Sequence, residues 1–271
     1  MRQADSIVSL VSRNNPGFQY NKIYLDSYLQ EVAASGESYP LAKTKFHNML
    51  SSGVFLLDYT GHASQLGWTN EQILTTADIK EMYNTRLPFW IGATCDFILF
   101  DVKEISAGEH VLLNQAGGGI GLFSAARTVY ASQNEKLNRY LTVNLFNKQN
   151  GKYNTLGDAV MKSKNQVGGE INKLSYTLLA DPALRLNYPT NYKVITAKIN
   201  NQPVQPTDTL RALSVNSVEG YIADDNGNKI SGFNGNLEVT IYDKVQKITT
   251  LNNHGDGSLV YLDRPNILYS G

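Results

Sequence analysis

The chain has 271 residues, which is enough for about two domains of ordinary size. Its composition is 42% hydrophobic and 18% charged, and 24 Lys and Arg residues balance 24 Asp and Glu residues. A neutral chain with no basic run creates no field that attracts nucleic acid, so we expect no nucleic-acid partner. The single cysteine excludes an intrachain disulfide.

The beginning of the chain is polar and lacks the apolar region of a signal peptide. No apolar stretch reaches the roughly 18 residues that a membrane span requires. We therefore expect either a protein that stays inside the cell or a piece of a longer exported protein.

Residues 1–190 alternate short apolar runs with amphipathic segments. The predicted strands cover 22–25, 54–59, 88–94 and 119–124, and the predicted helices cover 41–50, a segment from about 75, 106–117, 132–147 and 155–166. Four of these helices open with a capping-box pattern, at Thr75-x-x-Asp78, Ser106-x-x-Glu109, Ser132-x-x-Glu135 and Thr155-x-x-Asp158. Strand–helix repetition with nearly continuous apolar strands predicts an α/β domain, with a mostly parallel sheet and helices on both faces.

Residues 191–271 have a different pattern. Helical periodicity stops near Val194, and short alternating stretches are separated by Asn-Gly pairs at 226–227 and 234–235, which favour hairpin turns. We predict a small all-β domain, an immunoglobulin-like sandwich that is truncated at its end. Residues 224–228 resemble half of a calcium loop, but the acidic residue expected at the twelfth position is absent, so a hairpin turn is favoured and structural calcium is a secondary expectation.

Two residues with catalytic chemistry follow neighbouring predicted strands. Cys95 comes directly after the run 88–94, and His62 comes shortly after the run 54–60. Ligands of an open parallel sheet bind beyond the carboxyl ends of its strands, so both side chains are expected at the same crevice. A thiolate attacks a carbonyl carbon, and a nearby imidazole activates the thiol.

The backbone N–H groups of Ala63 and Cys95 are candidates for holding the oxyanion that forms in such an attack. A lone cysteine after a buried strand is also common as an inert apolar residue, and a lone histidine is common in loops. Spacing by itself leaves both interpretations open. We find no His, Cys and carboxylate set with zinc-ligand spacing and expect no required cofactor or metal.

The residues around the pair resemble the catalytic signatures of gingipain-type cysteine peptidases, which have a caspase-like fold. The resemblance rests on Tyr59-Thr-Gly-His62 and Ala93-Thr-Cys-Asp-Phe97, extends to Trp68-Thr-Asn-Glu71 and to the run 179–185, and covers roughly residues 20–190. It implies Cys95 as nucleophile and His62 as base. Asp58, Gly61, Trp68 and Glu71 are candidates for orienting the histidine or lining a substrate pocket.

Within this family the motifs look most like the sortase of the type IX secretion system, through Lys22-Ile-Tyr-Leu-Asp-Ser-Tyr28, Phe100-Asp101 and Ser106-Ala-Gly-Glu109. That branch implies cleavage of C-terminal sorting domains from cargo proteins and transfer of the acyl group to an amine on a lipopolysaccharide carrier. It also implies a place at the cell surface or outer membrane of a Gram-negative bacterium, among other secretion components. A gingipain-like surface or secreted endopeptidase is the first alternative.

Three departures from the family pattern keep a second alternative open, a peptidase-like binding module without activity. Ala63 stands where glycine is usual after the histidine, and its Cβ would be costly if the position needs a positive φ. Asp58 stands where asparagine is common, and its carboxylate is expected either to orient the imidazole or, as favoured here, to point to solvent. We also expect that the first half of a gingipain-type catalytic domain is missing from this chain, together with any residue it contributes.

Overall fold

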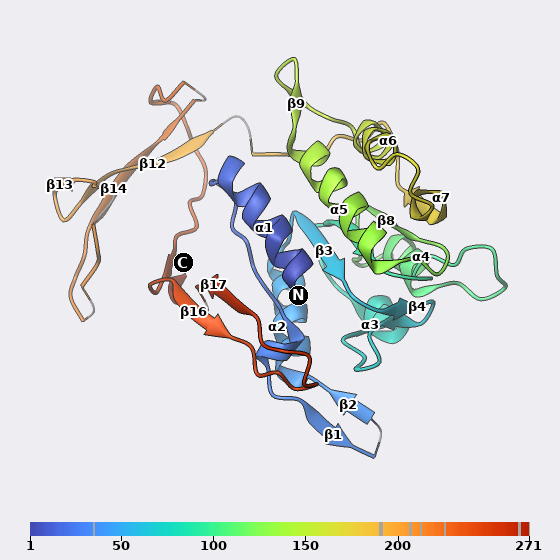
Figure 1. Ribbon diagram of the computed structural model, residues 1–271. Helices are drawn as coiled ribbons and strands as arrows, with labels where there is room; N and C mark the ends of the chain where they lie inside the picture. Colours follow the sequence, from blue (N-terminus) through green and yellow to red (C-terminus); the bar gives the residue numbers. More distant parts are fainter. Residues whose placement is uncertain are drawn as a thin grey trace. The chain divides into compact units, whose positions relative to one another are not determined.

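The computed structural model describes residues 1–34, 36–189, 192–205, 208–211, 213–224, 226–264 and 267–270. The chain forms two compact units (Figure 1). The first comprises Met1–Leu186 and Lys244–Pro265, and the second comprises Asn187–Asp243 and Asn266–Gly271. The site residues predicted from the sequence all lie in the first unit.

A four-stranded sheet forms the centre of the first unit, with the strand order β11-β8-β7-β3. Strands β3 (Leu56–Thr60), β7 (Phe89–Ala93) and β8 (Gly121–Ala125) are parallel. Strand β11 (Tyr176–Leu179), which the sequence analysis did not predict, pairs antiparallel with β8. Every residue of β7 and β8 is buried, as their continuous apolar sequences require.

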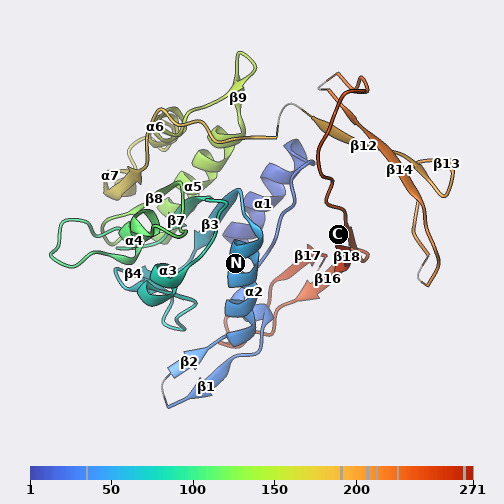
Figure 2. The same cartoon turned by 180° about the vertical axis from the view of Figure 1, so that it is seen from behind.

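Helices cover both faces of this sheet, so the predicted α/β class is confirmed. Helices α1 (Arg2–Asn14) and α5 (Ala131–Phe146) lie on one face. Helices α2 (Pro40–Ser52), α3 (Thr76–Glu81) and α4 (Ala107–Leu113) lie on the other (Figures 1 and 2). Helix α6 (Leu156–Gln166) packs on α5, and the short α7 (Asn172–Ser175) leads into β11.

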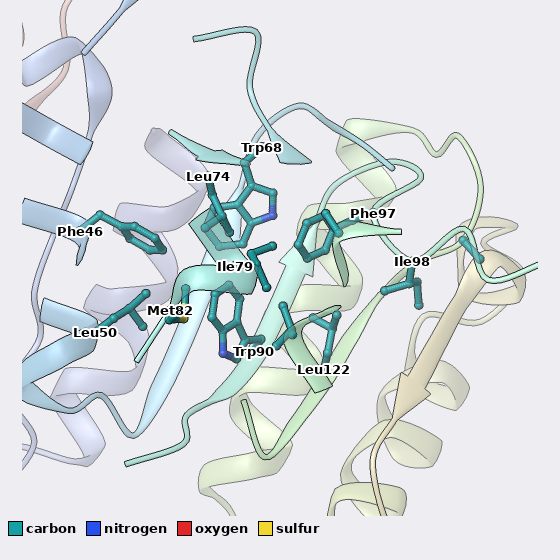
Figure 3. Packing of buried hydrophobic residues seen from close by; sticks show 13 residues of the cluster. Phe46, Leu50, Trp68, Leu74, Ile79, Met82, Trp90, Phe97, Ile98 and Leu122 are labelled. Atoms are coloured by element: carbon teal, nitrogen blue, oxygen red, sulfur yellow. The ribbon is translucent and has the colours of Figure 1, made fainter. Parts of the chain in front are cut away.

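The main hydrophobic core lies between the sheet and the helices α2, α3 and α4. Trp68 is at its centre, close to the rings of Phe46, Trp90 and Phe97 (Figure 3). Trp68 comes from a small three-stranded sheet, β4 (Ala63–Ser64), β5 (Gly67–Trp68) and β6 (Leu74–Thr75), which follows β3 directly. The core therefore fixes the segment that carries His62 as well as the sheet.

Two of the predicted capping boxes are complete in the structure. Thr75 and Asp78 cap α3, and Ser106 and Glu109 cap α4, each with both reciprocal hydrogen bonds. The Thr155 side chain accepts from the N–H of Asp158 at the start of α6. The pattern at Ser132 does not cap a helix, because α5 begins one residue earlier at Ala131. Helix α4 ends at Leu113, before the expected 117.

The strand predicted at 22–25 does not form. Residues 21–24 have no regular structure, and Leu25–Ser27 make a 3-10 helix. This segment contacts the hairpin of β16 (Gln246–Thr249) and β17 (Val260–Asp263), where Tyr24 packs edge-on against Tyr261 at 4.7 Å between ring centroids. The hairpin thus belongs to the first unit, although the sequence analysis grouped it with the β-rich tail.

The remaining short hairpins lie at the surface of the first unit. Strand β1 (Glu31–Ala33) pairs with β2 (Gly36–Ser38), and β9 (Lys148–Gln149) pairs with β10 (Lys152–Tyr153).

The second unit is β-rich, as predicted. Strands β12 (Lys193–Ile199), β13 (Gln202–Pro203) and β14 (Val218–Ala223) form one sheet, and β15 (Thr240–Tyr242) pairs with β18 (Ile267–Ser270). The immunoglobulin-like sandwich stays a prediction. In the turn after β14, Asp224 accepts hydrogen bonds from the N–H groups of Asn226 and Asn228, as expected for a hairpin turn. Asp225 lies outside the described residues.

Candidate active site

The two predicted catalytic residues follow adjacent parallel strands at equivalent positions. Thr60 at the end of β3 is directly opposite Ala93 at the end of β7. His62 and Cys95 each lie two residues further along, at the carboxyl edge of the sheet where ligands of such sheets bind. His62 is exposed and Cys95 is partly exposed, so reagents can reach both.

A set of close contacts holds the backbone at His62. The Tyr59 hydroxyl donates to the His62 carbonyl at 2.6 Å, and the Thr69 N–H donates to the same oxygen at 2.9 Å. The Tyr59 ring stacks on Trp68 at 4.0 Å with an angle of 6° between the planes. A Cβ at Gly61 would overlap the Tyr59 hydroxyl, which explains the glycine before His62.

The Cys95 thiol lies against the loop that follows β8. The Val129 N–H donates to Sγ at 3.5 Å, and Sγ lies 3.6 Å from the Val129 carbonyl oxygen. The Thr128 hydroxyl donates to the Asp96 carboxylate at 3.1 Å, and Asp96 has a positive φ of 51°. In the described part of the chain, no hydrogen bond joins the thiol to the His62 ring.

The N–H of Ala63, one of the two proposed oxyanion donors, is not used in the pairing of β4 with β5. Because the Thr69 N–H bonds the His62 carbonyl, Ala63 stands opposite Trp68 at a non-hydrogen-bonded pair, and its own N–H points away from β5. Ala63 is not one of the residues with positive φ, so its Cβ strains nothing. The objection raised by alanine in place of glycine is thereby removed.

Asp58 does not point to solvent, and the favoured expectation for this residue is wrong. Its position in β3 turns the carboxylate to the face under α5, where it accepts a hydrogen bond from the Asn138 side chain at 2.8 Å. Burial raises the pKa of Asp58 to about 6, although the hydrogen bond from Asn138 opposes that rise. Among the described residues, the side chain that bonds this carboxylate is thus an amide on α5 and not the imidazole.

The other predicted orienting or pocket residues line one cavity together with His62. This cavity has a volume of about 430 Å³ and is lined by Asp58, Gly61, His62, Trp68 and Glu71, among others. Trp68 is almost fully buried and acts as a packing partner of Tyr59. The Glu71 carboxylate lies 4.0 Å from the imidazole Nε2 of His254 in the loop between β16 and β17.

Three side chains of types that can bind a metal ion lie close together at this cavity. One atom each from Glu37, Glu71 and His254 lies within 4.8 Å of the others, and Glu37 and His254 are exposed. The three residues come from distant parts of the sequence, so spacing could not reveal them.

The sequence analysis did not identify the contacts that support the pair. The thiol is contacted by Val129, the His62 carbonyl by Tyr59, and the Asp58 carboxylate by Asn138. Tyr59 lies within the quoted motif and could have been singled out. Val129 and Asn138 carry no signal of their own, because only the folded sheet brings them close.

The mostly parallel sheet is covered by helices on both faces and carries Cys95 and His62 beyond its carboxyl edge, as expected for the caspase-like α/β fold of a cysteine peptidase. The model of Peptidase family C25 matches residues 2–187, and the chain belongs to that family. No curated protein matches the chain.

Solved structures match the fold. The complex of Porphyromonas gingivalis RgpB pro- and mature domains has a TM-score of 0.51 and 20% identity, over 57% of this chain and 40% of that one. The Arg-specific cysteine proteinase gingipain R has a TM-score of 0.50 and 20% identity, over 57% of this chain and 39% of that one. The chain thus spans about two fifths of the length of these structures. Among the described helices, none has the length and apolar character to cross a membrane.

Proposed function

We propose that the protein is a cysteine peptidase or transpeptidase in which Cys95 is the nucleophile and His62 the base. The observation that carries the proposal is the register of β3 and β7, which puts the two residues two positions beyond a directly opposed pair. Membership of Peptidase family C25 supports the same assignment. His62 is exposed and Cys95 is partly exposed, so a substrate can reach both side chains.

The reaction follows from these groups. His62 takes the thiol proton, and Sγ of Cys95 attacks the scissile carbonyl carbon. The N–H groups of Ala63 and Cys95 donate to the oxyanion, and each such donor is worth about 2.7–4 kcal/mol. The imidazolium then protonates the leaving amine, which leaves a thioester on Cys95. Attack by water on the thioester releases an acid, and attack by an amine makes a new amide, with His62 accepting the proton in either case.

The sortase assignment is the finer proposal. The motifs around residues 22–28 and 93–101 support a type IX secretion sortase that removes C-terminal sorting domains and uses an amine of a lipopolysaccharide carrier. The cell surface or outer membrane, with other secretion components as partners, is the corresponding location. The gingipain-like endopeptidase uses the same dyad, and it is supported by the fold match to gingipain R.

Two experiments test these proposals in order. Alkylation of Cys95 near neutral pH should be clearly slower in His62→Ala than in the unchanged protein. The control is His47→Ala, which removes a half-buried imidazole from α2 and should leave the alkylation rate unchanged. Equal rates in all three would show that the ring does not activate the thiol and would favour an inactive binding module. Cys95→Ala should abolish acyl transfer but keep the fold, because a small side chain replaces another.

Product analysis separates sortase from endopeptidase. A substrate carrying a sorting domain is incubated with the protein in the presence of an added amine. A ligated product supports the sortase, and hydrolysis alone supports the endopeptidase.

A further inference from the structure

The loop 126–130, which joins β8 to α5, carries backbone groups that contact the Cys95 thiol. The Val129 N–H donates to Sγ at 3.5 Å, and Sγ lies 3.6 Å from the Val129 carbonyl oxygen. The N–H stabilises the thiolate, whereas the carbonyl accepts a hydrogen bond only from the neutral thiol. Because S–H is a weak donor and hydrogen bonds to ions are the stronger ones, the two Val129 groups together favour the thiolate. The position of this loop therefore influences the reactivity of Cys95.

Two side-chain contacts of the loop lie at the surface. The Thr128 hydroxyl donates to the Asp96 carboxylate at 3.1 Å, and the Arg127 guanidinium donates to the Asp101 carboxylate at 3.0 Å. The side chains of Arg127 and Asp101 are 52% and 46% exposed. Water screens exposed pairs of this kind, so they add little to the order of the loop.

The short helix α7 holds the loop at both ends. At the first end, the Ala126 N–H donates to the Ser175 carbonyl at 2.8 Å. At the second end, the Asn172 side chain binds both backbone groups of Tyr130: Oδ1 accepts from the N–H at 3.1 Å, and Nδ2 donates to the carbonyl at 2.7 Å. The Tyr130 N–H and the Val129 carbonyl belong to one peptide unit. Asn172 thus holds the peptide unit that faces the thiol.

The Asn172 amide is buried and its hydrogen bonds are satisfied. The residue is 3% exposed, and Nδ2 makes a second bond, to Oδ1 of Asn134 at 2.7 Å. The Asn172 backbone N–H donates to Oε1 of Gln133 at 3.0 Å. One acceptor and two donors are in use on the amide, so aspartate would lack the donors and alanine would lack all three groups. A buried polar group with every bond satisfied is rigid, in contrast to the exposed pairs.

We propose that Asn172 is a positioning residue for the nucleophile: it fixes the Val129 groups at Sγ of Cys95 and thereby favours the thiolate. The inference rests on the proposed role of Cys95 and is independent of His62, whose ring makes no hydrogen bond to the thiol in the described part of the chain. Sequence spacing gives no sign of it, because 34 positions separate Cys95 from Val129 and 42 separate Tyr130 from Asn172.

The pH dependence of Cys95 alkylation tests this role. In Asn172→Ala the pH midpoint of alkylation should rise by about 0.5–1 unit, so that the rate near pH 7 falls about three- to tenfold. A purely structural role, which joins α7 to the start of α5, would lower stability to urea without moving this midpoint. An unchanged or lowered midpoint in folded Asn172→Ala would overturn the proposal.

Asn144→Ala is the matched control. Asn144 is another buried amide, 4% exposed, and it donates to Ser163 at 2.9 Å and to Gln166 at 2.7 Å. None of its described hydrogen bonds reaches the loop 126–130. Asn144→Ala should therefore lose stability to urea but keep the pH midpoint of Cys95 alkylation. An equal rise of the midpoint in this variant would show that general loosening, and not the hold on Tyr130, is the cause.

A milder variant keeps the proposal testable if Asn172→Ala does not fold. Asn134→Ala removes one acceptor of the Asn172 amide but leaves both bonds to Tyr130 in place. It should raise the midpoint in the same direction by a smaller amount, and no rise in this variant would contradict the proposal. In a Val129→Pro background, which lacks the N–H donor, Asn172→Ala should add nothing. A further rise there would mean that Asn172 acts on the thiol by another route, and the proposal would fall.

His62→Ala separates this inference from the proposed function. The rise caused by Asn172→Ala should persist in the His62→Ala background, because the Val129 contact does not involve the imidazole. If His62→Ala leaves alkylation unchanged and Asn172→Ala slows it, the assignment of the base fails and the positioning role stands. If His62→Ala slows alkylation and Asn172→Ala does not, the positioning role fails and the base stands.

Discussion

Replacement of Asp58 by asparagine should stabilise the protein at neutral pH and have almost no effect in acid. The carboxyl group has its pKa raised from 3.8 to about 6 by burial. At about 1.4 kcal/mol for each tenfold change in proton affinity, ionisation of this group costs the folded state up to about 3 kcal/mol. Because Asp58 also lines the cavity, water reaches part of it and lowers this cost. We expect ionisation of Asp58 to destabilise the folded state by about 1–3 kcal/mol.

The sign of the effect follows from the direction of the shift. A carboxyl group with a raised pKa binds its proton more tightly in the folded state than in the unfolded state. The penalty is absent below about pH 4, grows as the pH rises from 4 to 6, and is complete above that range. The amide introduced by Asp58→Asn would keep an oxygen that accepts from Asn138 but would never ionise.

Urea unfolding at about pH 4, 5, 6 and 7.5 measures the difference between the two proteins. The free energy of unfolding of Asp58→Asn should exceed that of the unchanged protein by about 1–3 kcal/mol at about pH 7.5 and match it near pH 4. The control Asp256→Asn changes an exposed carboxylate and should show no such pH dependence. A difference that is constant over this range, or a loss of stability at the highest pH, would refute the reasoning.

Three further substitutions test the packing around the site. Gly61→Ala should slow both acyl transfer and the alkylation of Cys95, because the added methyl group displaces the tyrosine hydroxyl that holds the histidine loop; normal turnover would show that the loop can shift freely. Ser106→Ala should cost about 1 kcal/mol in urea unfolding through the lost cap of α4, whereas Ser132→Ala, which caps nothing, should cost less than about 0.5 kcal/mol. Val129→Pro removes the N–H that donates to Sγ and should slow alkylation of Cys95, with Val129→Ala as the unaffected control.

The strands and caps that depend on local sequence were predictable. Continuous apolar runs identified β3, β7 and β8, and the capping boxes at Thr75 and Ser106 identified the starts of two helices. The pattern at Ser132 misled because the helix already begins at Ala131, with Tyr130 as its N-cap, and a Ser-x-x-Glu pattern fits just as well inside a first turn. Local signals therefore predict that a helix exists more reliably than where it starts.

The supports of the site were beyond prediction because they depend on contacts between distant residues. Asn138 reaches Asp58 across 80 positions, and Val129 reaches Cys95 across 34. The wrong expectation for Asp58 has the same origin. Alternation along β3 predicts that the side chains of Asp58 and Tyr59 lie on opposite faces of the sheet. Only the packing of α5 shows that the face carrying Asp58 is an interior one. The segment 22–25 has the composition of a strand, yet a strand needs a partner, and in the described chain β3 does not pair with it across the cavity.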